Sequence, residues 1–327
     1  MHLLFDYVED DAEVKHILAT SAIFVIPVIN LDGYDEMGKI HREKGHLVEL
    51  WKNRNQYPAQ KLCDSTNIGV DLNRNYPYMF GADDVGSTGI EDACNRKYRG
   101  PEALSEPETQ AIADFVTKWS NLKVAINLHA YGNNMILPFN YDSDAGNSQL
   151  KEKFPLAEQF FTHLFQHANF PPGCQMGNAA QIFSHPANGD ASDYFLASKG
   201  IYSFAQELGT QSESSQRFVL RHFKDIQTVV AENYPWMFYT MKQLYSWIQI
   251  DFTGMQQSDK HHSVLNFRIT NLGLSELTSS RVKLLLNMKQ VSEVKVNLGQ
   301  KELEADCSTY HCYVELAHVP SQDSESL

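Results

Sequence analysis

Residues 123–128 (KVAINL) form an almost uninterrupted apolar run, and this run decides how the chain is expected to fold. Residues 22–28 (AIFVIPV) and 201–208 (IYSFAQEL) are two further runs of this kind. Short apolar runs without strict alternation of polar positions are typical of strands that are buried on both faces, as in a parallel sheet. We therefore predict three such strands near the centre of the fold.

Helical patterns lie between and after these strands. Residues 106–119 carry apolar side chains at helical spacing, and Ser105 is expected to cap the start of this helix. Residues 148–167 and 215–247 also have a helical pattern, the second with a bend predicted at Pro235. Strands that alternate with helices predict an α/β fold with a mixed, largely parallel sheet flanked by helices.

The pattern changes after residue 250. We assign residues 1–250 to the α/β domain, because residues 251–263 are mostly polar and read as a linker. Residues 264–327 contain short strand-like runs separated by polar breaks, without a helical period. They predict a small all-β C-terminal domain.

The composition excludes some functions. The chain has 327 residues, with 27 Lys and Arg against 40 Asp and Glu, so its formal net charge is −13. Such an acidic chain lacks the basic surface with which proteins bind nucleic acid. No apolar run is long enough to cross a membrane as a helix. We therefore expect neither a nucleic-acid partner nor a membrane span.

Polar side chains stand at the ends of two predicted strands, the edge where open α/β sheets bind ligands. His129 follows residues 123–128 directly, and Glu207 lies near the end of residues 201–208. A lone histidine is more often structural or exposed than functional. A carboxylate in a segment suited to burial has to be paired, hydrated or protonated, so Glu207 is the stronger functional candidate.

A third candidate is the pair Asn73 and Arg74 in residues 69–77 (GVDLNRNYP). The guanidinium of Arg74 can bind a carboxylate through two parallel hydrogen bonds, and Asn73 can donate another. The alternative is a surface turn with an ordinary ion pair. From this segment alone, the surface turn is favoured.

Five segments, taken in order, resemble the zinc carboxypeptidase family of the pancreatic carboxypeptidase A and B kind. They are residues 26–34 (IPVINLDGY), 69–75 (GVDLNRN), 98–101 (YRGP) with 105–109 (SEPET), 127–131 (NLHAY), and 188–194 (NGDASDY) with 204–208 (FAQEL). The resemblance runs along most of residues 3–210 and does not extend beyond Phe252. It implies the α/β fold of that family.

The resemblance also implies roles for individual residues. His129 matches the third zinc ligand of the family, Glu207 matches its general base, and Asp71 matches a carboxylate that orients a ligand histidine. Asn73 and Arg74 match the pair that binds the terminal carboxylate of the substrate. The expected cofactor is therefore zinc, and the expected partners are peptide or protein C-termini.

Other positions depart from the family pattern. Depending on the alignment, Trp51 or Lys52 stands where the family has an arginine that polarises the scissile carbonyl, and only Lys52 can supply a charge. His185 stands where the family has a mobile tyrosine that closes over the substrate. Asp190 and Ser192 fall in the specificity pocket. Asp190 there favours basic C-terminal side chains, or it caps the helix that begins beside it.

Two further features follow from the resemblance. Cys63 and Cys94 flank the Asn-Arg segment as a family disulfide does, and if they pair, a secreted or lumenal compartment is favoured. The other two zinc ligands of the family belong to a His-x-x-Glu motif before the strand at residues 22–28. No such motif precedes it here, and the one at residues 46–49 follows it and is interpreted as a loop.

We therefore expect that the N-terminal part of the domain is missing from this sequence, which leaves one of three zinc ligands. One hypothesis is a zinc-dependent exopeptidase that removes C-terminal amino acids from peptides or proteins. The second is a non-catalytic module that binds protein C-termini through Asn73 and Arg74. A third alternative is a chain that does not fold independently, because an exposed sheet edge invites pairing with other chains.

Overall fold

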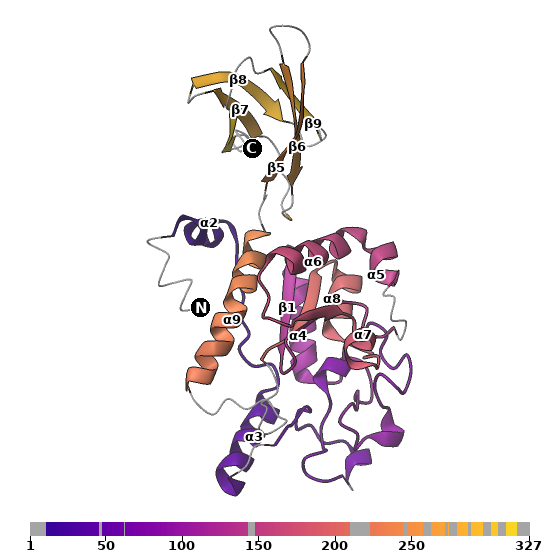
Figure 1. Ribbon diagram of the computed structural model, residues 1–327. Helices are drawn as coiled ribbons and strands as arrows, with labels where there is room; N and C mark the ends of the chain where they lie inside the picture. Colours follow the sequence, from indigo (N-terminus) through magenta and orange to yellow (C-terminus); the bar gives the residue numbers. More distant parts are fainter. Residues whose placement is uncertain are drawn as a thin grey trace, which may run out of the picture. The chain divides into compact units, whose positions relative to one another are not determined.

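The computed structural model describes residues 11–45, 48–61, 63–142, 148–209 and 223–244, together with Leu274 and the backbone of six strands between Ile248 and His318 (Figure 1). The chain divides into two compact units. One comprises Ile23–Tyr239, and the other comprises Met1–Ala22 with Thr240–Leu327. The predicted motifs of the α/β domain lie in the first of these units.

Four strands form the sheet of the Ile23–Tyr239 unit, in the order β1-β4-β2-β3. Their bounds are β1 Val124–His129, β2 Asn134–Ile136, β3 Gln175–Gly177 and β4 Tyr202–Glu207. β1 runs parallel to β4 and β2 runs parallel to β3, whereas β2 and β4 are antiparallel. The mixed, largely parallel sheet is confirmed, with β1 and β4 at the runs predicted for them.

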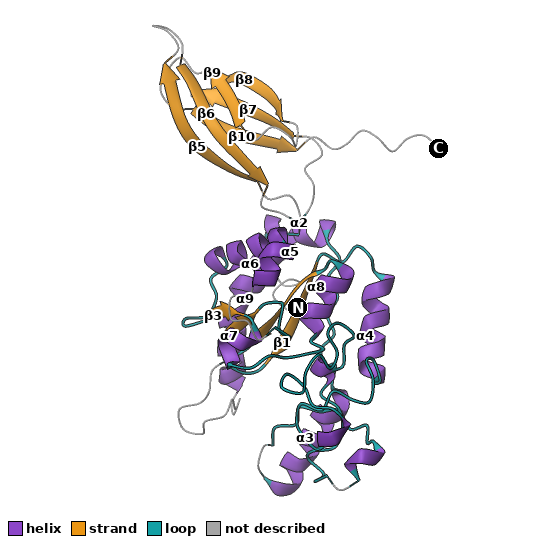
Figure 2. Ribbon diagram, turned by 90° about the vertical axis from the view of Figure 1, so that its right-hand side faces the viewer, coloured by secondary structure: helices purple, strands orange, loops and turns teal. Residues whose placement is uncertain are grey.

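Helices cover both faces of this sheet (Figure 2). The described helices are α2 Ala12–Thr20, α3 Leu31–Lys44, α4 Pro107–Lys118, α5 Ser148–Lys153, α6 Pro155–His167, α7 Ala179–Phe183, α8 Ala191–Lys199 and α9 Phe223–Lys242. On one face, the Phe204 ring lies 6.0 Å from Phe161 of α6 and 5.9 Å from Trp236 of α9. On the other, Ile112 of α4 shares an apolar cluster with Phe195 of α8. Ala125 of β1 packs against this cluster, so each face of the sheet contributes to a packed layer.

The predicted helices form with shifted ends. The first begins at Pro107 and its N-cap is Glu106, not the predicted Ser105, because proline suits the first helical position. Residues 148–167 divide into α5 and α6 around Phe154, just before a second N-terminal proline. The last predicted helix is observed over Phe223–Lys242 and contains Pro235.

The strand predicted at residues 22–28 is wrong. These residues form no ladder with any described strand, and a strand exists only through hydrogen bonds to a neighbour. Val25 and Ile26 are 52% and 47% exposed, so the run is not buried on both faces either. Phe24 alone is anchored, with its ring 5.1 Å from Phe115 and 5.0 Å from Trp119.

The C-terminal region is all-β in its described residues. Two three-stranded antiparallel sheets have the orders β10-β7-β8 and β5-β6-β9. Their strands are β5 Ile248–Gln257, β6 Ser263–Asn271, β7 Ser280–Leu286, β8 Lys289–Val296, β9 Glu302–Asp306 and β10 Cys312–His318. β5 includes the first half of the stretch that the sequence assigned to a linker.

Candidate functional site

His129 and Glu207 are neighbours at the end of the sheet. They are the last residues of β1 and β4, and the parallel register pairs them directly. The Leu208 amide donates to the His129 carbonyl at 2.8 Å, so the hydrogen bonding between the two segments continues one residue beyond this pair. The structure therefore brings together two residues that are 78 positions apart in the sequence, at the edge where α/β sheets bind ligands.

The surroundings of Glu207 favour its protonated form. Burial raises the pKa of Glu207, while the nearby positive charges of His129 and Arg74 lower it. The loop after β1 passes close to Glu207, since a Cβ on Gly132 would lie 3.7 Å from the Cβ of Glu207. A buried carboxyl group with a raised pKa is a candidate for proton exchange with a bound ligand.

Arg74 is a buried cation at this edge. It ends a short 3-10 helix, Leu72–Arg74, and is only 8% exposed. Its Nε donates to the Gly86 carbonyl at 3.0 Å, and one Nη donates to the Asn73 carbonyl at 2.8 Å. Among the described residues it forms no ion pair. The remaining N–H groups of the guanidinium are thus left for an anion.

Asp71 lies beside both Arg74 and His129. Burial raises the pKa of Asp71, and the charge of Arg74, the Asn73 amide, His129 and Lys52 lower it, in that order. One Asp71 oxygen accepts the Asn73 amide at 3.0 Å and so caps the 3-10 helix. Asp71 is within electrostatic range of His129, but the structure contains no hydrogen bond between them.

Asn73, Asp190 and Ser192 are tied to the fold by their side chains. Asp190 caps α8, where one oxygen accepts the Ser192 amide at 2.8 Å, and the other accepts the Asn73 side chain at 2.8 Å. The Asn73 oxygen accepts the Ala191 amide at 3.1 Å. The buried Ser192 hydroxyl accepts the Asn127 amide at 2.8 Å. The helix-cap alternative for Asp190 therefore has a direct structural basis.

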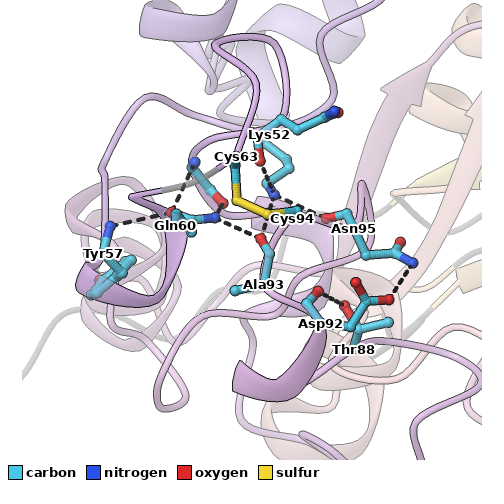
Figure 3. Close-up of a disulfide and its surroundings, with 11 residues drawn as sticks. Lys52, Tyr57, Gln60, Cys63, Thr88, Asp92, Ala93, Cys94 and Asn95 are labelled. Atoms are coloured by element: carbon cyan, nitrogen blue, oxygen red, sulfur yellow. Dashed lines mark hydrogen bonds between the residues drawn. A yellow bond between two sulfur atoms is a disulfide. The ribbon is translucent and has the colours of Figure 1, made fainter.

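Lys52 is buried and faces backbone carbonyls rather than the edge with His129 and Glu207. Its Nζ donates to the carbonyls of Asn67, Ala93 and Asn95, at 2.6, 3.0 and 2.9 Å (Figure 3). Lys52 is 3% exposed. All three N–H groups of the ammonium donate to these carbonyls, so Lys52 connects the loop around Asn67 with the loop at residues 93–95.

A disulfide joins the same two loops. Cys63 and Cys94 are bonded, as the resemblance implies, with their Cα atoms 5.3 Å apart and a sequence separation of 31 residues (Figure 3). Gln60 donates to the Ala93 carbonyl at 2.8 Å beside this bridge. Residues 93–95 are therefore fixed from two sides.

His185 lies in a positively charged environment. Burial lowers the pKa of His185, and the charges of Lys97, Arg74 and Arg96 lower it further, against a raising effect of the Pro186 carbonyl. That carbonyl lies 3.1 Å from Nδ1 of the ring. His185 therefore lies within electrostatic range of Arg74.

The sequence analysis did not single out Arg96 and Lys97. Arg96 lies over the ring of Trp51, with its guanidinium carbon 4.3 Å from the ring centroid. The only signal in the sequence is the pair of adjacent cations two and three positions after Cys94. A cation in a loop is typical of an ordinary surface position, and only the fold shows which residues it contacts.

The described residues do not contain a complete zinc site. A catalytic zinc normally has three protein ligands, and no group of three His, Cys, Asp or Glu side chains able to hold a metal occurs in the part that the structure describes. His129 offers one imidazole. His46 of the 46–49 motif lies outside the described residues. Two further ligands would have to come from residues that the structure does not describe.

No helix among the described residues is both long enough and apolar enough to cross a membrane. This finding agrees with the sequence expectation for the residues searched.

Sequence comparison identifies relatives over the α/β domain. A family profile described as zinc carboxypeptidase matches residues 1–235. Carboxypeptidase B2 of Homo sapiens is 28% identical over 198 residues, which are 60% of this chain and 43% of that protein. Carboxypeptidase A1 of Rattus norvegicus is 30% identical over 205 residues, 62% of this chain and 44% of that protein. The chain spans less than half the length of these relatives.

Solved structures share the fold at low identity. Bovine thrombin-activatable fibrinolysis inhibitor, in complex with tick carboxypeptidase inhibitor, has a TM-score of 0.52 at 23% identity, over 73% of this chain and 74% of that one. A crystal structure of thrombin-activatable fibrinolysis inhibitor has a TM-score of 0.53 at 22% identity, over 73% of this chain and 58% of that one. At such identities the likeness establishes the fold alone.

Proposed function

The chain belongs to the zinc carboxypeptidase family, and from this premise we propose that it acts on the C-termini of peptides or proteins as part of a zinc-dependent exopeptidase. The observation that supports the proposal is the direct pairing of His129 and Glu207 at the ends of parallel strands, with the unpaired cation Arg74 within electrostatic range of Glu207. An imidazole, a carboxyl group of raised pKa and a carboxylate-binding arginine are the groups that hydrolysis of a terminal peptide bond requires.

Each residue has a separate task in this proposal. Arg74 binds the terminal carboxylate of the substrate through its free N–H groups, and Asn73 supplies the second N–H of its amide. Glu207 accepts a proton from the attacking water and delivers it to the leaving amine, because burial holds its pKa above that of an exposed glutamate. His129 is one zinc ligand, and Asp71 is the carboxylate that orients its ring.

The proposal requires ligands beyond the described residues. His129 alone does not hold zinc with useful affinity, so two more ligands have to be supplied by residues outside the described part. No step is therefore assigned to the metal here. Lys52 has no task in the reaction, since its N–H groups are used by backbone carbonyls.

The second candidate is a non-catalytic module that binds C-termini. It is favoured by one observation, namely that the carboxylate-binding Arg74 is in place while the described residues contain no three-ligand group. Binding of a free carboxylate is common to both candidates. Zinc content and release of an amino acid distinguish them.

The first test measures binding to peptides that end in a free carboxylate or in an amide. We expect amidation to weaken binding by about tenfold or more, because the charge-assisted bonds to Arg74 are lost. Arg74→Met should abolish this difference. Arg42→Met, an exposed arginine on α3, is the matched control and should preserve it. Equal binding of acid and amide peptides by the unmodified chain would contradict both candidates.

The second test equilibrates the chain with zinc and measures bound metal and release of the C-terminal amino acid. If residues outside the described part complete the ligand set, the exopeptidase predicts about one zinc per chain and chelator-sensitive release. Glu207→Gln should abolish release and keep the metal, whereas His129→Ala should lose both. Selective binding of free carboxylates without zinc and without release would decide for the binding module.

A further inference from the structure

We propose that Arg96 and Lys97 bind an acidic side chain of the substrate, so that the site prefers peptides with Asp or Glu among their last two residues. The inference rests on the proposed function, because it takes Arg74 as the point that holds the terminal carboxylate. It adds a second anion-binding point to the same site. The observations that support it are the position of Arg96 on Trp51 and the grouping of three cations around His185.

Arg96 lies over an aromatic ring and has no anionic partner in the described part of the chain. Its guanidinium lies 4.3 Å from the centroid of the Trp51 ring, and Trp51 is 45% exposed. Stacking occupies the face of a guanidinium and leaves the N–H groups on its edge available for hydrogen bonds. Arg96 is exposed and forms no ion pair among the described residues. It is thus presented to an anion from solution.

The segment that carries Arg96 is rigid. The Lys52 ammonium binds the carbonyls of Ala93 and Asn95, and the disulfide holds Cys94 between them. Lys52 directly follows Trp51 in sequence, so the same contacts fix the stacking surface and the arginine above it. Groups that are already in place lose little conformational entropy when a ligand binds.

The side chains of Lys97 and Arg74 both reach the short loop at residues 85–86. The Lys97 Nζ lies 3.5 Å from the Val85 carbonyl, and the Arg74 Nε lies 3.0 Å from the carbonyl of the next residue, Gly86. Burial lowers the pKa of Lys97, and the charges of Arg74 and Arg96 lower it further, against raising effects of Asp71 and Asp83. Three cations that repel one another favour a ligand with more than one negative charge.

The acidic residue nearest the expected specificity pocket does not counter this preference. Asp190 caps α8 and also accepts a hydrogen bond from Asn73, so both of its oxygens are used within the fold. A basic C-terminal side chain would find these oxygens already bonded. The cations Arg96 and Lys97, in contrast, have no carboxylate partner among the described residues.

The test measures dissociation constants of fluorescently labelled peptides with free C-termini by anisotropy. Four peptides end in Glu-Leu, Gln-Leu, Leu-Glu or Leu-Gln, so that charge is compared at constant shape. We expect one of the two glutamate peptides to bind about tenfold more tightly than its glutamine counterpart. Arg96→Met keeps an apolar stem on Trp51 and should reduce this ratio to about twofold or less, and Lys97→Met should reduce it in part.

The control is Arg42→Met, which changes the net charge of the chain equally but lies on α3. It should leave the ratio unchanged, and an equal loss of the ratio in this variant would overturn the proposal. A ratio of one for both peptide pairs in the unmodified chain would overturn it without any variant. If all free acids still bind better than their amides in that case, the proposed function stands and only the acidic preference fails.

Discussion

Lys52 is a buried cation that stabilises the fold through its hydrogen bonds. Burial lowers the pKa of Lys52 to about 8, against raising effects of Asp71 and Asp92. The pKa of an unfolded lysine is about 10.4. Since the folded protein releases this proton first, the unfolded chain binds more protons between these two values. The contribution of Lys52 to the free energy of unfolding therefore rises with pH across this window.

The first prediction compares the unmodified chain with Lys52→Met. The variant should be less stable by about 1–3 kcal/mol, because three carbonyls lose the Lys52 donor. The carbonyls of Ala93 and Asn95 keep one other donor each, from Gln60 and the Tyr98 amide. The difference should grow between about pH 8 and pH 10. Urea unfolding at several pH values measures it, with Lys39→Met on the exposed face of α3 as the control. A difference that stays constant or shrinks with rising pH contradicts the assigned pKa.

Asp193 is a buried carboxyl group that accepts hydrogen bonds from backbone amides. It accepts the Asn140 amide at 2.9 and 2.8 Å with its two oxygens, and the Tyr141 amide at 3.1 Å. Burial and the charge of Asp190 raise the pKa of Asp193 well above its usual value, while these amides lower it. Its acceptor atoms, more than its charge, are therefore what the fold requires.

The second prediction follows for two variants at this position. Asp193→Ala leaves two buried amides unpaired and should lower the free energy of unfolding by about 2–5 kcal/mol. Asp193→Asn keeps a carbonyl acceptor and should lower it by less than half as much. Thermal or urea unfolding at neutral pH measures both. Equal losses in the two variants would show that the charge is what matters.

At the scale of elements, the sequence correctly predicted the strands β1 and β4 from their continuous apolar runs. β4 is buried over residues 203–206, whereas β1 is half-buried and its Leu128 is exposed. The run at residues 22–28 has the same composition but no hydrogen-bonded neighbour among the described strands, and composition does not encode a neighbour. α3 was missed, although Asn30 caps it and Gly45 ends it at a φ of 70°.

For the candidate site, the sequence likewise predicted where some residues lie but not which way their side chains point. The positions of His129 and Glu207 follow from the ends of two strands, and the register pairs them. The direction of a side chain does not follow in this way. Lys52 and Asp190 stand in segments that match the family, but their polar atoms are bonded within the fold. The stacking of Arg96 on Trp51 joins residues that no local pattern connects.

The third prediction concerns the disulfide between the two loops. A bridge across 31 residues restricts the unfolded chain, and the chain-entropy estimate of its contribution is about 3–4 kcal/mol. Replacing both Cys63 and Cys94 by Ser should lower the free energy of unfolding by this order. Cys174→Ser changes a cysteine that is free in the structure and should have little effect. An unchanged urea midpoint in the double variant would contradict the prediction.

At the scale of the whole molecule, the net charge of the chain is negative, whereas the side chains around His185 are positively charged. The chain carries a net charge of −13, whereas Arg74, Arg96 and Lys97 surround His185. Salt at physiological strength screens interactions between exposed charges beyond about 8 Å. We therefore expect acidic peptides to be repelled at long range only at low ionic strength, and the proposed preference to depend on these local cations.

The fourth prediction concerns the division of the chain into two units. The residues assigned to the site lie between Trp51 and Glu207, all within the Ile23–Tyr239 unit. A chain that ends after residue 247 keeps the ion pair of Lys242 with Glu13 at 3.0 Å and loses the contact of Leu274 with Gln243. Because no site residue is removed, its affinity for C-terminal peptides should stay within about twofold of the full chain. Circular dichroism with a cooperative thermal transition verifies that the shortened chain is folded. A folded chain that binds more than about tenfold more weakly would show that the strands beyond residue 247 contribute to the site.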